Sequence, residues 1–190
     1  MVPRLIAVGA SLGGLDALQS LLRALPATFT CPIVIVQHRR PEVDGRLVEL
    51  LKGRSTLPVL EPDDKEPIEP GHVYLAPPSY HLVVERGFFS LSLDAPVLFA
   101  RPSIDVLFES VADSYGADGV AVMLTSSNDD GAQGAQAVKA SGGRVVVQDP
   151  ASAKAPEGPR SVLATVAVDR ILSLEDLPRF LVDLCQSPGH

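Results

Sequence analysis

Short apolar runs alternate along the chain with longer segments whose hydrophobic residues recur every three or four positions. Residues 5–8 (LIAV) form the first apolar run, and residues 31–37 (CPIVIVQ) form a second one that is rich in β-branched side chains. Such continuous runs are typical of strands buried on both faces of a sheet. Between them the apolar residues follow helical spacing, at Leu15, Leu18, Leu21, Leu22 and Leu25. The pattern therefore predicts a strand–helix–strand unit with two parallel strands.

The same alternation returns in the second half of the chain. Residues 119–124 and 144–148 are predicted strands, and an alanine-rich helix ending at Ser141 connects them. A further helix is predicted before the strand at residues 119–124. Ser103 is a suitable N-cap for it, and Asp105 lies in its first turn. The buried face of that helix is predicted to comprise Ile104, Leu107, Phe108, Val111 and Tyr115.

The predicted elements between and after these units are shorter. We expect a helix over residues 43–52, a strand over 71–76, and a hairpin of residues 81–85 and 88–93 joined by Arg86-Gly87. Towards the end, the pattern predicts a loop over 150–160, a helical turn over 161–164, a strand over 166–168 and a final helix over 173–185. The predicted fold class is α/β, a three-layer sandwich with a mostly parallel, doubly wound sheet and a small antiparallel hairpin. No linker-like segment divides the chain, so residues 1–190 are expected to form a single domain.

Composition narrows the class of protein. A net charge of −7 argues against partners that are nucleic acids or anionic membranes. No apolar stretch approaches the roughly 18 residues needed to cross a bilayer, so we expect no membrane insertion. Cys31 and Cys185 lie at the start of a buried strand and near the tail, and we expect no structural disulfide. A cytoplasmic location follows from that expectation.

Three candidate catalytic groups follow three predicted parallel strands. Ser11 comes directly after the first strand, between Gly9 and Gly13, and His38 comes directly after the second. In an open α/β sheet the carboxyl ends of the strands form one edge, where ligands bind. The pair Asp129-Asp130 follows the third strand, and one carboxylate can orient His38 while the other caps a helix. The spacing thus predicts a serine nucleophile, a histidine base and an orienting aspartate.

Two other interpretations compete for the glycine-bracketed serine. The nucleophile elbow of α/β-hydrolases has the same spacing, but it requires the acid before the histidine, and the order here is the reverse. The spacing also approaches a dinucleotide fingerprint, with Ser11 in place of a glycine, so a nucleotide-binding domain is a further alternative. His72 and His81 lack a dense set of partner ligands and are expected to have structural or surface roles, so we predict no metal and no cofactor.

Five stretches together resemble the catalytic domain of the chemotaxis protein-glutamate methylesterases, the CheB family. They are GASLGG (9–14), VQHRRP (36–41), GHVYLAPPSYH (71–81), RPSIDVLFESVA (101–112) and MLTSSNDDGAQG (123–134). The resemblance implies a three-layer α/β fold and a triad of Ser11, His38 and Asp130. It implies hydrolysis of glutamate methyl esters on the cytoplasmic helices of methylated chemoreceptors, with glutamine deamidation as a related activity. The backbone N–H groups of Leu12 and Ser127 are then expected to form the oxyanion hole.

The sequence also departs from the family pattern. The loop usually written Thr-Gly-Met-Gly is Thr-Ser-Ser-Asn at residues 125–128, which removes two glycines that adopt positive φ readily. The alternative function is therefore a catalytically weakened, receptor-binding regulatory module. Arg101, and the pair Arg39-Arg40, are candidates for contacts with an acidic substrate helix. Family members usually carry a receiver domain, which we do not find in this chain, so a separate regulator acting in trans would take its place.

Overall fold

A computed structural model describes residues 4–38 and 46–186 of the chain. Seven strands form one parallel sheet in the order β3-β4-β2-β1-β7-β8-β9, and a separate antiparallel pair, β5-β6, lies beside it. The strands are β1 (Leu5–Ala10), β2 (Ile33–Gln37), β3 (Val59–Leu60), β4 (Val73–Leu75), β5 (His81–Val84), β6 (Phe89–Ser92), β7 (Gly119–Met123), β8 (Arg144–Gln148) and β9 (Arg170–Leu172).

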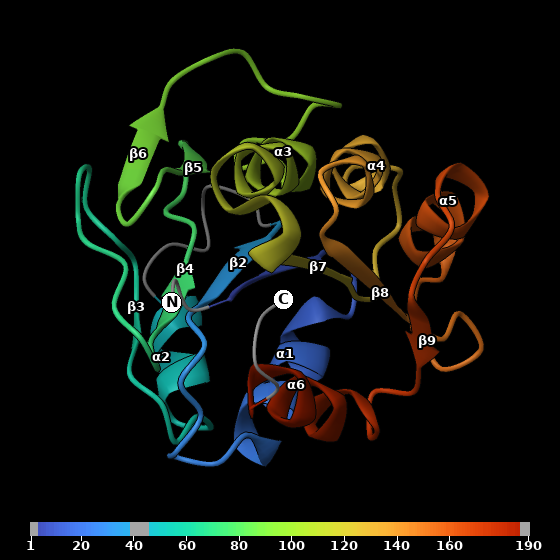
Figure 1. Cartoon of the computed structure of the whole chain (residues 1–190), viewed down its shortest axis with the longest axis horizontal. Helices are drawn as coiled ribbons and strands as arrows, with labels where there is room; N and C mark the ends of the chain where they lie inside the picture. Colours follow the sequence, from blue (N-terminus) through green and yellow to red (C-terminus); the bar gives the residue numbers. More distant parts are fainter. Residues whose placement is uncertain (1–3, 39–45, 187–190) are drawn as a thin grey trace.

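Helices cover both faces of the sheet and complete the predicted three layers (Figure 1). On one face lie α1 (Gly14–Ala24), α2 (Arg46–Lys52) and α6 (Leu177–Gln186); on the other lie α3 (Ile104–Tyr115), α4 (Ala132–Ala140) and α5 (Glu157–Thr165). A short 3₁₀ helix, η2 (Gly116–Asp118), connects α3 to β7. The residues expected at 43–45 of the second helix lie outside the described part of the chain.

Strand β1 occupies the middle of the sheet and supplies both cores. Ile6 and Val8 pack on the side of α1 and α6, whereas Leu5 and Ala7 pack on the side of α3 and α4. All four side chains are fully buried. This explains why the strand reads as a continuous apolar run: alternate side chains point to opposite faces, and both faces are covered.

The predicted hairpin is confirmed, with β5 and β6 paired in antiparallel register. It attaches to α3 through two serines. The Ser110 hydroxyl accepts a hydrogen bond from the Val84 N–H, and the Ser114 hydroxyl donates one to the Val84 carbonyl. The second half of α3 is thereby fixed relative to the hairpin.

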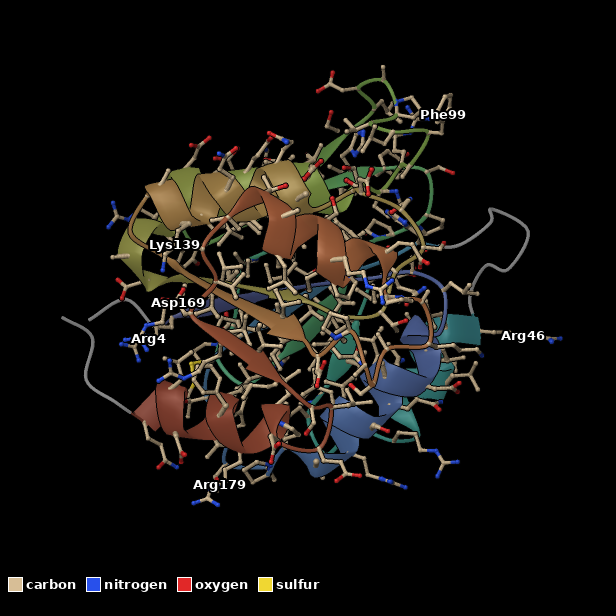
Figure 2. All side chains as sticks on the ribbon, turned by 90° about the vertical axis from the view of Figure 1, so that its right-hand side faces the viewer. Arg4, Arg46, Phe99, Lys139, Asp169 and Arg179 are labelled. Carbon is tan, nitrogen blue, oxygen red and sulfur yellow. A yellow bond between two sulfur atoms is a disulfide. The ribbon has the colours of Figure 1, made fainter. Side chains whose placement is uncertain are left out.

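The C-terminal third differs from the prediction in two places. Helix α5 begins at Glu157 instead of residue 161, because Pro159 lies in the first turn, where its missing N–H costs no hydrogen bond. The last strand is at Arg170–Leu172 instead of 166–168. The strand begins directly after Asp169, whose carboxylate accepts a hydrogen bond from Lys139 Nζ at 2.7 Å (Figure 2). The same carboxylate accepts from the Val145 N–H at 2.8 Å.

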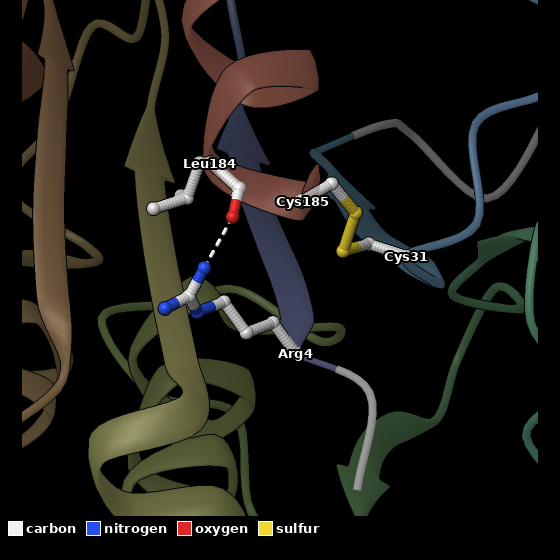
Figure 3. The surroundings of a disulfide bond; sticks show 4 residues. All are labelled: Arg4, Cys31, Leu184 and Cys185. Atoms are coloured by element: carbon white, nitrogen blue, oxygen red, sulfur yellow. Dashed lines mark hydrogen bonds between the residues drawn. A yellow bond between two sulfur atoms is a disulfide. The ribbon is translucent and has the colours of Figure 1, made fainter. Parts of the chain in front are cut away.

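The expectation of unpaired cysteines is wrong. Cys31 and Cys185 form a disulfide with their Cα atoms 6.0 Å apart, joining the segment before β2 to the end of α6 (Figure 3). The Arg4 guanidinium donates a hydrogen bond to the Leu184 carbonyl beside it. Sequence spacing gave no sign of this proximity because it arises from the packing of α6 under the sheet. None of the helices in the described ranges has the length and apolar character needed to span a bilayer.

Candidate active site

Ser11 lies in the turn between β1 and α1, at the carboxyl edge of the sheet. Its N–H donates to the Thr125 carbonyl at 3.0 Å, and its carbonyl accepts from the Gly14 N–H at 2.9 Å. Gly13 holds the turn with a φ of +81°. A Cβ at Gly13 would lie 2.8 Å from Cβ of Lys154, so glycine is required there for both conformation and space.

His38 and Asp130 meet above the ends of β2 and β7, the two strands that flank β1. The His38 Nε2 atom lies 2.7 Å from Oδ2 of Asp130. The His38 N–H donates to the Ala10 carbonyl at 2.9 Å, which fixes the histidine next to the end of β1. The sheet order thus brings together side chains that are 92 positions apart in the sequence.

Asp130 is fully buried and accepts several hydrogen bonds at the amino end of α3. Besides His38, its donors are the Ser103 hydroxyl at 2.8 Å and the N–H groups of Ile104 and Asp105 at 2.8 and 2.9 Å. Burial by itself raises the pKa of a carboxyl group, but these hydrogen bonds outweigh it and hold the pKa of Asp130 below its usual value. The carboxylate that contacts His38 is therefore kept charged.

Asp105 makes the reciprocal contacts at the amino end of α4. Its Oδ1 atom accepts hydrogen bonds from the N–H groups of Gly131 at 2.9 Å and Gly134 at 2.8 Å. Burial, together with the nearby charge of Asp130, raises the pKa of Asp105 even though these hydrogen bonds act in the opposite direction. Two buried carboxyl groups with opposite pKa shifts thus lie side by side.

Gln37 connects the serine turn to the histidine. Its Nε2 atom donates to the Ser11 carbonyl at 2.8 Å and to the His38 carbonyl at 2.9 Å. Its Oε1 atom is buried and has no hydrogen-bond partner among the described residues. A Cβ on Gly14 would lie only 1.9 Å from Oε1, so the amide fills the space that this glycine leaves open.

A cavity of about 480 Å³ beside Ser11 and His38 contains both expected oxyanion donors, Leu12 and Ser127. Neither the Leu12 N–H nor the Ser127 N–H donates a hydrogen bond to another described residue. Lys154 and Asp16 also line this cavity. Two unused backbone donors next to a hydroxyl group are what the oxyanion of an acyl-transfer intermediate requires.

The loop at residues 125–128 does not use the positive φ values that two glycines would allow. None of Ser126, Ser127 and Asn128 is among the described residues with positive φ. Ser126 is completely buried, and its hydroxyl donates to Oδ1 of Asn128 at 3.2 Å. Its N–H donates to the Ala155 carbonyl, and its carbonyl accepts from the Gly158 N–H. The loop is therefore held by α5 and the segment before it.

A second cavity, of about 510 Å³, opens on the other side of Ser11 and His38. We call it the arm-side cleft, because the segment 93–101 between β6 and α3 forms much of its wall. Arg101 lines it, and its Nη1 atom donates to the carbonyls of Leu93 and Asp94 at 2.9 and 3.0 Å. Arg101, expected to bind substrate, therefore also supports this segment.

The other candidate residues are Asp129, His81, Arg39 and Arg40. Asp129 is exposed and outside both cavities, so the structure favours Asp130 as the partner of His38. His81 is buried and structural: its Nδ1 accepts from the Ser103 N–H, and its Nε2 donates to the Ala95 carbonyl. No group of metal-ligating side chains exists among the described residues. Arg39 and Arg40 lie outside the described residues.

Ser11 and His38 line the same two cavities. In the part of the chain that the structure describes, no hydrogen bond joins the Ser11 hydroxyl to the imidazole. The support supplied by Gln37 and Asp105 was not predicted from the sequence. The only signals for it were a polar residue at the end of an apolar strand and an acidic residue in the first turn of a helix.

Comparison with known proteins identifies the family of the chain. The family model described as CheB methylesterase matches residues 6–181. The chain is 43% identical over 183 residues to a putative protein-glutamate methylesterase/protein-glutamine glutaminase of Leptospira interrogans strain Fiocruz L1-130, covering 96% of this chain and 95% of that protein.

Other relatives are longer. A protein-glutamate methylesterase/protein-glutamine glutaminase of Anaeromyxobacter dehalogenans is 38% identical over 179 residues, covering 94% of this chain but 52% of that protein. The crystal structure of the Thermotoga maritima CheB methylesterase catalytic domain superimposes with a TM-score of 0.92 at 33% identity, covering 97% of this chain and all of that one. The predicted fold class is confirmed, and the chain belongs to the CheB methylesterase family.

Proposed function

We propose that this protein is a serine esterase that removes methyl esters from glutamate side chains of chemoreceptors. The observation that carries the proposal is the His38–Asp130 hydrogen bond of 2.7 Å at the wall of a cleft that also contains Ser11. The names of its relatives in Leptospira and Anaeromyxobacter support the same substrate class. We further propose that residues 1–190 act as one catalytic domain in the cytoplasm, where the reducing environment would open the Cys31–Cys185 disulfide.

The mechanism follows from which atoms are already occupied. Because Nε2 of His38 is paired with Asp130, its Nδ1 atom is the one that accepts the Ser11 proton as Oγ attacks the ester carbonyl. The charged Asp130 stabilises the imidazolium that forms. The Leu12 and Ser127 N–H groups stabilise the negative oxygen of the tetrahedral intermediate. The imidazolium then protonates the departing methanol, and water hydrolyses the acyl-enzyme by the same route.

Glutamine deamidation uses the same steps with ammonia as the leaving group. The relatives' names include protein-glutamine glutaminase, which makes this the natural second reaction. The orienting carboxylate and the oxyanion donors serve both reactions unchanged.

The test is methanol release from methylated receptor cytoplasmic fragments, combined with labelling by a fluorophosphonate probe. We expect Ser11→Ala to lose on the order of 10⁶-fold in kcat if the triad acts as a unit. Ser79 lines the same cleft, so Ser79→Ala is the matched control and should keep both labelling and turnover. Equal labelling of wild type and Ser11→Ala would refute the nucleophile.

A weakened, receptor-binding module is the second candidate. The observation that favours it is the missing hydrogen bond between Ser11 and His38 among the described residues, together with the altered loop at 125–128. It predicts binding of receptor fragments without methanol release from wild type. The nucleotide-binding alternative lacks such support, since the Lys154 side chain covers Gly13, where a pyrophosphate would have to approach.

A further inference from the structure

The segment 93–101 forms an arm whose tip carries exposed apolar side chains. Leu98 and Leu93 are 53% and 66% exposed, and Phe99 is completely exposed. Figure 2 shows Phe99 at the outer edge of the molecule, beyond the ends of the helices. A fully exposed phenylalanine ring does not stabilise the isolated chain, because it removes no apolar surface from water.

The tip is a tight two-residue turn with an unusual sequence. Val97 and Ala100 exchange two backbone hydrogen bonds, of 3.0 and 2.8 Å. Between them Leu98 and Phe99 have φ values of +46° and +64°. Turns with two positive φ values strongly favour Asn-Gly, whereas large side chains there are strained. The chain thus presents two large apolar groups at a position where small residues would fold more easily.

The base of the arm is fixed to the catalytic site. Arg101 donates two hydrogen bonds to the carbonyls of Leu93 and Asp94. His81 donates to the Ala95 carbonyl, and its other ring nitrogen accepts from the Ser103 N–H. Ser103 in turn donates to Asp130. An apolar tip on such a supported base resembles the preorganised anchors that dominate protein–protein recognition.

The chemistry of the arm-side cleft indicates what the arm contacts. Leu98 and Phe99 line the same cleft as Ser11 and His38. Among the described residues that line it, Arg101 is cationic and none is acidic, although the whole chain has a net charge of −7. The lining therefore complements an anionic partner that also offers an apolar side chain.

We propose that Leu98 and Phe99 bind an apolar side chain on the substrate helix, next to the glutamyl ester, and so make the enzyme prefer esters carried by acidic amphipathic helices over small free esters. This inference rests on the proposed esterase function and adds the residues that select its substrate. Side chains three or four positions apart lie on one face of a helix. One face can therefore place the ester at Ser11 and an apolar group against the arm.

The test compares three substrates and two variants. The small substrate is N-acetyl-glutamate γ-methyl ester amide. The large one is a designed, glutamate-rich coiled-coil peptide with one γ-methyl glutamate and a leucine four positions away, together with a version in which glutamine replaces that leucine. Leu98→Asn/Phe99→Gly removes the apolar groups but keeps the residues that this turn prefers, so its thermal melting temperature should not fall. Ile171→Thr, at a half-exposed apolar position on β9, is the control.

We expect the double variant to hydrolyse the small ester like wild type and to show a KM at least about tenfold higher for the leucine peptide. For the glutamine peptide, wild type and double variant should be equal. An unchanged KM for the leucine peptide overturns the proposal while leaving the esterase intact. An equal loss of activity on the small ester and the leucine peptide also overturns it, since the arm would then act on the triad. If wild type hydrolyses neither ester, the proposed function itself fails. Dimerisation that depends on Phe99, with an unchanged KM, would assign the tip to contacts between copies of this chain.

Discussion

Asp130 caps helix α3, whose first turn contains Asp105, and Asp105 caps helix α4, which begins just after Asp130. Asp130, two residues before α4, accepts from the first N–H groups of α3, and Asp105, in the first turn of α3, accepts from N–H groups at the start of α4. Both carboxyl groups therefore lie at the positive ends of helix dipoles. These two sets of hydrogen bonds together fix the position of the Asp130 carboxylate, which contacts His38.

The first prediction separates the shape of Asp105 from its charge. Asp105→Ala leaves the Gly131 and Gly134 N–H groups buried without an acceptor, so the free energy of unfolding should fall by about 1–3 kcal/mol. Asp105→Asn keeps an oxygen for both donors and should stay within about 1 kcal/mol of wild type at neutral pH. Urea unfolding monitored by circular dichroism measures both. Equal losses in the two variants would contradict the capping role.

The second prediction concerns acid stability. The pKa of Asp130 is lower in the folded than in the unfolded protein, so its contribution is complete above about pH 4, the usual unfolded value, and is lost as the pH falls through the folded pKa. The stability gap between wild type and Asp130→Asn should therefore narrow as the pH falls below about 4.

Asp105 should behave in the opposite way. Its pKa is raised by folding, so its stabilising contribution is complete below the unfolded value and is lost as the pH rises through the folded pKa. Asp105→Asn should accordingly gain stability relative to wild type as the pH rises from about 4. Urea titrations at several pH values test both signs, and parallel pH profiles for the two variants would refute the assignment.

The third prediction tests Gln37 as a positioning residue. Gln37→Met has a similar length but cannot donate to the Ser11 and His38 carbonyls. We expect kcat to fall by at least about tenfold, equivalent to 1.4 kcal/mol, with little change in KM, because the triad geometry changes and the substrate surface does not. Gln19→Met, at an exposed hydrogen-bonding glutamine on α1, is the control. A change confined to KM would show that Gln37 does not position the triad.

The fourth prediction links α5 to the oxyanion loop. A Cβ at Gly158 would lie 2.6 Å from Cβ of Ser126, so Gly158→Ala should displace residues 125–128. Removing one oxyanion donor costs about 10²–10³ in kcat, which sets the upper limit of the effect. Ser126→Gly removes this contact, whereas Cε at the flexible end of Met123, also 2.6 Å away, can move aside, so the double variant should recover part of the lost kcat. A double variant no better than Gly158→Ala would indicate another cause.

The fifth prediction concerns the disulfide. It links residues 154 positions apart, so its removal by Cys185→Ser should lower the free energy of unfolding by about 2–5 kcal/mol under oxidising conditions. With dithiothreitol present, wild type and variant should have nearly equal stability in guanidinium unfolding. A difference that persists in the reduced state would assign the loss to packing of the cysteine side chain.

Periodicity alone predicted the strands that carry the site, because β1, β2 and β7 are buried on both faces and read as unbroken apolar runs. It failed for α5 and β9, where Pro159 obscured a helix start and the strand position depends on the long-range contact between Asp169 and Lys139. Ser11, His38 and the pair Asp129-Asp130 could be chosen because each follows a strand end, and the family resemblance then selected Asp130. The supports at Gln37 and Asp105 could not, since hydrogen bonds between distant segments leave no period in a sequence. Pairing of Cys31 with Cys185 was missed for the same reason.

The central position of β1 in the sheet has a consequence that does not depend on any single side chain. The chain leaves β1 through α1 on one face of the sheet and leaves β7 through α4 on the other, so the two exits diverge and a hollow forms between them. The recess is a product of the winding, whereas the chemistry depends on single residues placed along its rim. Under the proposed function, replacing Ser11 would end the reaction and leave the recess in place, which makes the scaffold a starting point for a different catalyst.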